Sequence, residues 1–368
     1  MKKIVLLVVT FISLTTFAQK DELKTLKKIY GKESVSEKDL AEFKSNLASL
    51  EGMSLDEDQA VYAKFYKVMY PTLELYAKGD KATPMDQLKL YTPSFVKEYG
   101  EVIDATMAYE TKVGKKIYYD DLVQEKNQFI TQLKTIGNQA YNASQFEQAS
   151  GFFYLLYTFD PKGQGQELEN AAISAVQSKN YKLAEKLYDE LKDSDYLNNG
   201  TIYYAKSKVS DEEETFPNRD ARVKAIALGT HEKPRDEKVV TKKPEVYRML
   251  GILASSNGNL EKAKKILAQA RELNPNDQEV KNEEARIYFN EAYELLKDDQ
   301  KLVDEINNNL DNKTKYDELM AKRKGVFEKA LPSFEKAYSL NPDDQNTKNL
   351  LKMSYEVVGQ KDKAATVK

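Results

Sequence analysis

Apolar and small residues recur at helical spacing along most of the chain. In residues 257–275, NGNLEKAKKILAQARELNP, the side chains of Ala263, Leu267 and Ala270 fall on one face of a helix, with lysines and glutamates on the other face. An Asn-Gly-Asn turn precedes this helix, and Pro275 follows it because proline cannot continue a helix. The pattern predicts a helix–turn–helix unit whose helices approach closely at the alanines.

The same order of positions recurs at a regular spacing. Ala149 and Ala184 are 35 residues apart, and Ala330 and Ala364 are 34 apart. A period of about 34 residues is typical of helix–turn–helix solenoids, whose units bury their cores only by stacking. The structural positions of these units are a small residue in the first helix, an alanine in the second helix and a proline after it: Gly137, Ala149, Pro161, Ala172, Ala184, Gly251, Ala263, Pro275, Ala330, Pro342 and Ala364.

With these positions in phase, the units resemble tetratricopeptide repeats (TPRs). The resemblance implies an all-α fold, a TPR-type α-solenoid of antiparallel helix pairs in a superhelix whose concave face is lined by the first helices. The stretches FPNRDARVKAIALGTHEKPRDEKVVTKKPEVY (216–247) and KMSYEVVGQKDKA (352–364) also resemble segments of exported TPR proteins of the Bacteroidota. This second resemblance concerns fold and compartment, and it implies no activity.

The pattern divides the chain into consecutive segments. They are a signal peptide (1–18), an irregular, TPR-like helical region (19–129), two TPRs (130–196), an insertion (197–243), a TPR (244–277), an extended TPR-like helical pair (278–342) and a C-terminal TPR-like pair (343–368). In the extended pair we expect helices over 278–308 and 313–339. In the insertion we expect a small β-hairpin over 202–216, a short helix over 221–229 and then a polar loop.

The N-terminus has the features of a secretory signal peptide. Lys2 and Lys3 precede an apolar stretch over 4–17, which is too short to span a bilayer, and Ala18 suits cleavage after it. The alternative is an uncleaved anchor. Because no cysteine lies near the cleavage site, the bacterial lipoprotein route is excluded. We therefore predict an exported protein, periplasmic or secreted, with no transmembrane segment in the mature chain.

Composition excludes several classes of function. The chain of 368 residues has 56 Lys and Arg against 59 Asp and Glu, so no strong field attracts nucleic acid or an anionic membrane. It has no cysteine and one histidine, so disulfides, thiolate nucleophiles and Cys/His zinc sites are excluded. We predict no cofactor and no metal.

Candidate catalytic residues are few. His231, beside Glu232, is the histidine on which a catalytic triad would depend, and we favour a structural or surface role for it. The run DEEET (211–215) offers carboxylates for calcium, but it lacks the alternation and the turn glycine of a calcium loop, so a solvated loop is favoured. Neither a phosphate-binding glycine loop nor a G-x-S-x-G motif occurs. The sequence therefore predicts a protein that is not an enzyme.

The first helices of the expected repeats carry a candidate binding groove. Lys134, Asn138 and Asn170 resemble half of the carboxylate clamp in chaperone-cofactor TPR domains, and that resemblance implies recognition of a peptide's terminal carboxylate. The family takes two further basic residues from the next repeat, where this chain has Glu245 and Met249, although Arg248 lies between them. The alternative is a generic polar groove, in which Asn170 serves the repeat fold.

These features predict a non-enzymatic scaffold or adaptor of the bacterial envelope that binds a protein or peptide partner. A chaperone-like binder of exported clients is the alternative within the same class. A third hypothesis places a small-ligand, glycan-binding or enzymatic role at the 197–243 insertion, and it requires an enclosed pocket there.

Overall fold

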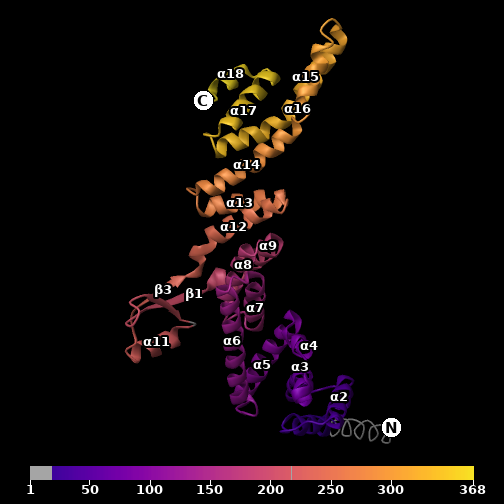
Figure 1. The fold of residues 1–368 in the computed structure, drawn as a ribbon, viewed down its shortest axis with the longest axis vertical. Helices are drawn as coiled ribbons and strands as arrows, with labels where there is room; N and C mark the ends of the chain where they lie inside the picture. Colours follow the sequence, from indigo (N-terminus) through magenta and orange to yellow (C-terminus); the bar gives the residue numbers. More distant parts are fainter. Residues whose placement is uncertain (1–18, 217) are drawn as a thin grey trace, which may run out of the picture. The chain divides into compact units, whose positions relative to one another are not determined.

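The computed structural model describes residues 19–216 and 218–368, and the chain forms two compact units (Figure 1). The first unit ends at Ser178 and the second begins at Lys179, inside the segment 130–196 in which two repeats are expected. The signal peptide predicted over 1–18 lies outside the described residues. Among the helices of the described ranges, none is both long enough and apolar enough to cross a membrane.

The described part of the first unit is helical. After a helix over 19–30 come α2 (Glu37–Glu51), α3 (Glu57–Lys78), α4 (Pro84–Leu88), α5 (Pro93–Val113), α6 (Tyr119–Asn142), α7 (Phe146–Phe159) and α8 (Gly165–Gln177), with 3-10 turns at Gly79–Lys81 and Lys89–Tyr91. Ser36, Asp56 and Thr83 begin α2, α3 and α4 in capping boxes, each completed by the side chain three residues later. These local signals divide the irregular N-terminal region into discrete helices.

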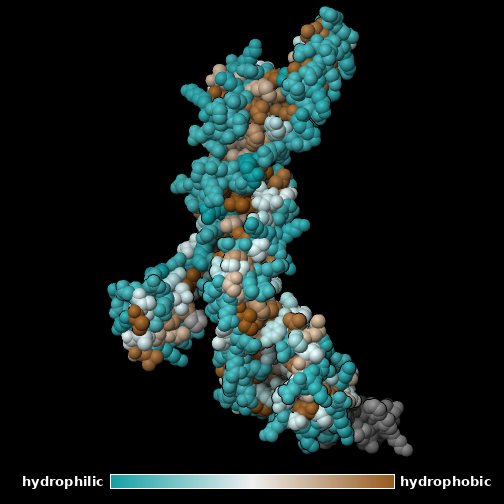
Figure 2. All heavy atoms as spheres, in the orientation of Figure 1, coloured by the Kyte–Doolittle hydropathy of each residue, from teal (hydrophilic) through white to brown (hydrophobic). Residues whose placement is uncertain are grey.

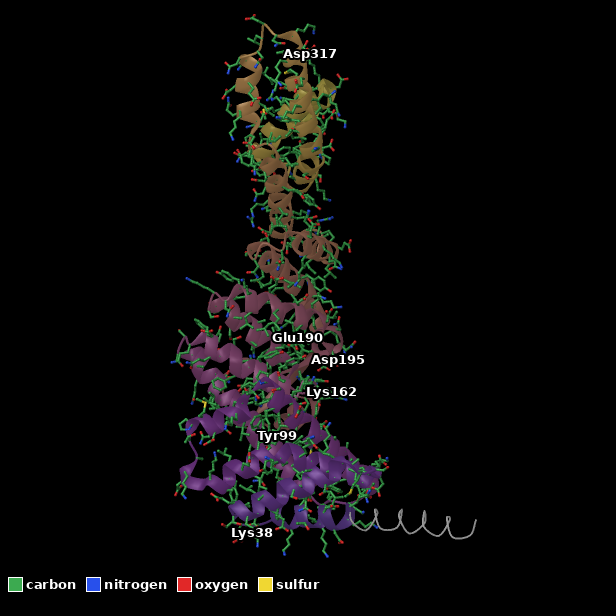
Figure 3. The ribbon with its side chains drawn as sticks, turned by 90° about the vertical axis from the view of Figure 1, so that its right-hand side faces the viewer. Lys38, Tyr99, Lys162, Glu190, Asp195 and Asp317 are labelled. Carbon is green, nitrogen blue, oxygen red and sulfur yellow. The ribbon has the colours of Figure 1, made fainter. Side chains whose placement is uncertain are left out.

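Aromatic side chains form the core of the N-terminal helices. The ring of Tyr30 lies edge-on to the rings of Phe65, Tyr66 and Tyr118, with centroids between 5.3 and 5.9 Å apart. Tyr99 also lies among the helices of this unit (Figure 3) and is 5% exposed. The aromatic faces of these helices therefore stabilise the unit internally, since edge-on aromatic pairs add to the apolar area that they bury.

The second unit continues with α9 (Tyr181–Asp193) and α10 (Asp195–Asn199). After the insertion come α12 (Lys243–Ser256), α13 (Leu260–Leu273), α14 (Gln278–Leu295), α15 (Asp299–Asn307), α16 (Lys313–Leu340), α17 (Gln345–Val358) and α18 (Lys361–Thr366). Successive helices pack against each other in the order α12, α13, α14, α16, α17 and α18, which is an α-solenoid arrangement. Hydrophilic residues predominate on the visible face of each unit (Figure 2), because the apolar residues lie between helices.

Small residues bring the paired helices together. A Cβ atom at Gly137 would lie 2.8 Å from the ring of Phe153, and one at Gly251 would lie 2.6 Å from the side chain of Leu267. The alanines of the repeat pattern are buried: Ala149, Ala172, Ala184, Ala263, Ala330 and Ala364. The prolines each follow the last residue of a helix by two positions: Pro161 after α7, Pro275 after α13 and Pro342 after α16.

The insertion contains a three-stranded antiparallel sheet in the order β2-β1-β3. Strands β1 (Thr201–Ser207) and β2 (Glu213–Phe216) form a hairpin, α11 (Arg219–Ala227) follows, and a 3-10 turn (Val239–Lys242) leads into α12. The prediction of a polar loop after the short helix is wrong, because residues 231–238 form strand β3 (His231–Lys238), which pairs with β1.

Strand β3 has no alternating apolar pattern. It is a strand because its backbone pairs with β1. All but two of its residues are exposed, and Lys233 (φ 50°) with Pro234 falls where its register with β1 is irregular. Since a proline has no N–H to donate, it is tolerated at a bulge or on an edge strand.

The extended pair differs from the expectation in its first arm. That arm is divided, since α14 ends at Leu295 and α15 begins at Asp299, whereas α16 is continuous and contains Pro332. Helix α15 packs on α16, and Arg323 holds Asp299 through two nitrogens at 2.7 and 2.8 Å. Figure 3 shows Asp317 near the start of α16, at the end of this extended pair.

Candidate functional site

Helix α6, the first helix of the first expected repeat, begins at a buried carboxylate. Glu110 of α5 has no exposed surface, and it accepts the backbone N–H groups of Ile117, Tyr118 and Tyr119 at 2.9 to 3.1 Å. The hydroxyl of Tyr62 donates to the same carboxylate at 3.1 Å. Because the first N–H groups of a helix lack intrahelical partners and carry partial positive charge, this carboxylate fixes the start of α6 to α5 and α3.

One side of α6 carries six amide side chains, which we call the amide row: Gln124, Asn127, Gln128, Gln132, Asn138 and Gln139. All six are exposed, and their spacing places them on one side of the helix. Gln132 donates to Tyr91 at 3.4 Å, and the other five make no side-chain hydrogen bond within the described part of the chain. Thr131 and Thr135 lie among them, and each bonds a backbone carbonyl of α6.

The charged side chains on the same stretch of α6 are engaged within the first unit. Lys126 pairs with Asp104 at 2.7 Å, and Glu125 accepts a hydrogen bond from the Tyr99 hydroxyl. Lys134 also has a partner in its own unit. From Gln124 to Gln139 the helix therefore offers amide donors and acceptors and no free charge.

A shallow, open hollow follows the N-terminal part of the amide row. Its volume is about 590 Å³, and its lining includes Asp120, Val123, Gln124, Asn127, Gln128, Thr131 and Gln132. Each amide presents both a donor and an acceptor, as the backbone of an extended polypeptide does. The row runs for about 22 Å along the helix, which is the length of roughly seven extended residues.

The half clamp expected from the sequence holds a carboxylate of the chain itself. The Nζ of Lys134 lies 3.0 Å from one carboxylate oxygen of Glu167, and the Nδ2 of Asn170 donates to the other at 2.8 Å. Glu167 is 2% exposed, so its charge requires such partners. The structure brings Lys134 and Asn170 together on Glu167, whereas Asn138 belongs to the amide row. Recognition of a peptide terminus by these residues stays a prediction.

Arg248, the fourth candidate, lies in the second unit on α12. Its Nη1 is 2.8 Å from Glu279 and 3.8 Å from Asp277 at the start of α14. Arg286 of α14 donates in return to the Ser255 hydroxyl of α12 at 3.2 Å. These contacts join the first helices of two neighbouring pairs, so Arg248 contributes to helix packing.

The pair α12–α13 is also the part of the chain that matches a known family. Residues 244–277 match the family model described as Tetratricopeptide repeat. The chain contains a tetratricopeptide repeat. The close approach of Gly251 to Leu267 lies inside this TPR.

Two solved structures are similar to the chain at low identity. The crystal structure of MamA protein is 13% identical, covering 66% of this chain and 88% of MamA at a TM-score of 0.32. The structure of YrrB, described as a TPR protein with an unusual peptide-binding site, is 15% identical, covering 63% of this chain and 78% of YrrB at a TM-score of 0.30. No curated protein sequence matches the chain.

A second buried carboxylate joins the TPR to α9. Glu185 of α9 is 7% exposed and accepts hydrogen bonds from Asn257 at 2.7 Å, Lys262 at 2.9 Å and Asn259 at 3.0 Å. Burial raises the pKa of Glu185, but the hydrogen bonds from Asn257, Lys262 and Asn259 outweigh it, so this pKa lies below its ordinary value. The turn before α13 therefore also ties the TPR to α9.

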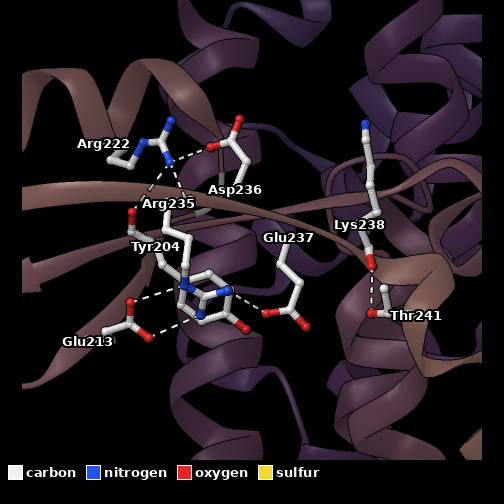
Figure 4. Close-up of polar contacts among 8 residues, drawn as sticks. All are labelled: Tyr204, Glu213, Arg222, Arg235, Asp236, Glu237, Lys238 and Thr241. Atoms are coloured by element: carbon white, nitrogen blue, oxygen red, sulfur yellow. Dashed lines mark hydrogen bonds and ion pairs between the residues drawn. The ribbon is translucent and has the colours of Figure 1, made fainter.

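Two arginines organise the insertion (Figure 4). Arg222 of α11 is 6% exposed, and its Nη1 donates to the backbone oxygens of Tyr204 and Arg235 and pairs with Asp236 at 2.5 Å. The guanidinium of Arg235 lies 4.1 Å from the ring centroid of Tyr204 and pairs with Glu213 at 3.0 Å. These contacts use cation–π and charge-assisted hydrogen bonds to hold α11 and both outer strands to β1.

His231 belongs to the same sheet. Its Nε2 lies 3.1 Å from Glu214 and its Nδ1 2.8 Å from the Thr230 hydroxyl, while its ring packs edge-on against Phe216. The acids of the DEEET run thus include β2 residues that pair across the sheet, where a solvated loop was favoured. Within the described ranges, no three Asp, Glu or His side chains converge as metal ligands.

Proposed function

We propose that the protein binds an extended segment of a partner polypeptide along the amide row and acts as a non-enzymatic scaffold or adaptor. One observation carries this proposal. Five exposed amides of α6 have no side-chain partner in the described structure, while Glu125, Lys126 and Lys134 between them are all engaged. In a chain with 31% charged residues, such a stretch is a distinct chemical surface.

The amide row suits a polypeptide backbone. A side-chain amide can donate its N–H to a backbone carbonyl and accept a backbone N–H, whatever side chains the partner carries. Each neutral hydrogen bond contributes about 0.5–1.5 kcal/mol net, and ordering the partner opposes it, so we expect weak binding, no tighter than micromolar. Because no free charge takes part, this affinity should change little with salt.

The proposal includes an exported location, periplasmic or secreted, in the bacterial envelope. It is supported by the charge and apolar pattern of residues 1–18 with Ala18 at the cleavage position. A chaperone-like binder of exported clients is the second candidate, since contacts with the backbone tolerate many sequences. A single stoichiometric partner from the envelope supports the scaffold, and many unfolded clients support the chaperone.

The test compares two sets of amide substitutions in the mature protein. The first removes part of the row with Gln124→Ala, Asn127→Ala and Gln128→Ala, and alanine preserves the helix. The control removes the exposed amides Asn308 and Asn346, which lie in the second unit and have no side-chain hydrogen bond among the described residues. Binding of an uncharged extended peptide, followed by fluorescence anisotropy, should weaken about tenfold in the first variant, which corresponds to about 1.4 kcal/mol, and stay unchanged in the control. Equal binding by all three proteins would refute the proposal.

A further inference from the structure

A separate pocket lies among the N-terminal helices of the first unit, and we call it the tyrosine pocket. It has a volume of about 280 Å³ and lies between the helix over 19–30, the start of α3 and the connection from α5 to α6. Its floor includes Tyr62, Tyr66 and Tyr118, and one side carries Lys20, Lys24 and Lys27. None of these residues belongs to the amide row.

The tyrosine hydroxyls in the floor of the tyrosine pocket already have hydrogen-bond partners within the protein. The hydroxyls of Tyr66 and Tyr118 bond each other at 2.7 Å, and the hydroxyl of Tyr62 donates to Glu110 at 3.1 Å. Burial raises the pKa of both Tyr62 and Tyr66, so these phenols stay neutral. Tyr62 and Tyr66 are 7% and 2% exposed and form the buried base of the pocket, so an occupant meets mainly the partly exposed side chains of Tyr118 and Leu23.

The rim of the pocket is cationic on one side. Lys20, Lys24 and Lys27 are exposed, and their spacing of four and three residues places them on one face of the helix. Within the described ranges, none of these lysines takes part in an ion pair. They form a row of free charges about 10 Å long.

The lining also includes two aspartates at the start of α3, and the fold engages both. Asp56 caps α3 by accepting the backbone N–H of Gln59 at 2.9 Å, and Asp58 accepts the Tyr109 hydroxyl at 2.9 Å. These aspartates disfavour an extended anionic surface such as a membrane, because it would place negative charge against the aspartates as well as the lysines. A peptide can place its carboxylates against the lysines alone.

We infer that the tyrosine pocket binds an acidic peptide segment of a partner protein. One large apolar or aromatic side chain of the peptide lies on the tyrosine floor, and flanking carboxylates pair with Lys20, Lys24 and Lys27. The volume of about 280 Å³ has room for one large side chain. Charge-assisted contacts give this site a salt dependence that the neutral amide row lacks.

The experiment uses the mature protein and a fluorescein-labelled peptide with one phenylalanine between two pairs of glutamates. The test variant combines Lys20→Glu, Lys24→Glu and Lys27→Glu. The matched control is Lys28→Glu, an exposed lysine of the same helix that does not line the pocket. Thermal unfolding of all variants checks that the exposed substitutions leave the fold intact.

We expect the triple variant to bind about tenfold more weakly, because three attractive pairs become repulsive, and the control to bind as the wild type does. Replacing the peptide's phenylalanine by alanine should also weaken binding. The amide-row variant should bind this peptide as the wild type does, so the experiment tests the tyrosine pocket independently of the amide row. An unchanged triple variant, an equal loss in Lys28→Glu, or binding to phosphatidylglycerol–phosphatidylcholine vesicles without binding to the peptide would overturn the inference.

Discussion

Lys134 and Glu167 form an ion pair at 3.0 Å in which the carboxylate is buried and the ammonium group is half exposed. Lys134, which the sequence suggested as a partner for a ligand's carboxylate, therefore neutralises the buried carboxylate of Glu167. Asn170 completes the cluster from the same helix as Glu167. In the proposed function, ligand recognition on α6 therefore depends on neutral amides, including Asn138.

The first prediction follows from this pair. Peptides that end in a free acid and in an amide should bind with affinities within about twofold, because Lys134 is engaged with Glu167. Lys134→Ala should leave peptide binding unchanged but lower the free energy of unfolding by about 1–3 kcal/mol, since a buried carboxylate loses its cation. Anisotropy titrations and thermal unfolding measure the two effects. A tenfold preference for the free acid that disappears in Lys134→Ala would restore the clamp hypothesis.

The second prediction concerns a helix contact in the first unit. A Cβ atom at Gly100 of α5 would lie 1.9 Å from the carbonyl oxygen of Phe159, so Gly100→Ala forces the backbone apart. We expect it to destabilise the unit by about 1–3 kcal/mol. Gly151→Ala on α7 is the control, because nothing lies within 4 Å of its Cβ position, and alanine should stabilise this helix by about 0.5–1 kcal/mol. Calorimetric melting that shows the same sign for both substitutions would contradict this packing.

The third prediction is a pH dependence at Glu185. Its pKa is lowered in the folded state, so its network stabilises the fold above the pKa of the unfolded chain, and this contribution is lost as pH falls through the lowered value. Glu185→Gln should therefore have a lower melting temperature than the wild type at about pH 7. The gap between the two melting temperatures should shrink as pH falls below the ordinary glutamate pKa of 4.5. A gap that stays constant as pH falls below that value would show that Glu185 does not carry the effect.

The parts of the fold that were predictable depend on local residue types. Gly251 and Leu267 signal a close helix pair because only a small residue allows the approach, and Pro275 marks the helix end. The hairpin of β1 and β2 was visible in its aromatic and β-branched residues. These signals lie within short stretches of sequence, so a pattern read along the chain contains them.

The parts that were missed depend on partners distant in sequence. Strand β3 has exposed charged residues, and pairing with β1 makes it a strand. Gly100 lies outside the repeat pattern, and its need for a glycine comes from Phe159. Nothing in the sequence around Glu167 indicated that it would pair with Lys134. The amide row carried a partial signal, since Gln124, Asn127 and Gln128 recur three and four residues apart. They precede residue 130, where the first repeat was expected to begin, whereas α6 begins at Tyr119.

The central claim is that a partner polypeptide lies on the amide row, and site-specific photocrosslinking in the native cell tests it most directly. Gln128 is replaced by the photoreactive residue p-benzoylphenylalanine, and Asn308 is replaced in the same way in a control protein. We predict a crosslinked partner polypeptide, identified by mass spectrometry, from position 128 and none from position 308. A partner that co-purifies with both proteins yet crosslinks at neither position, or equally at both, would contradict the account.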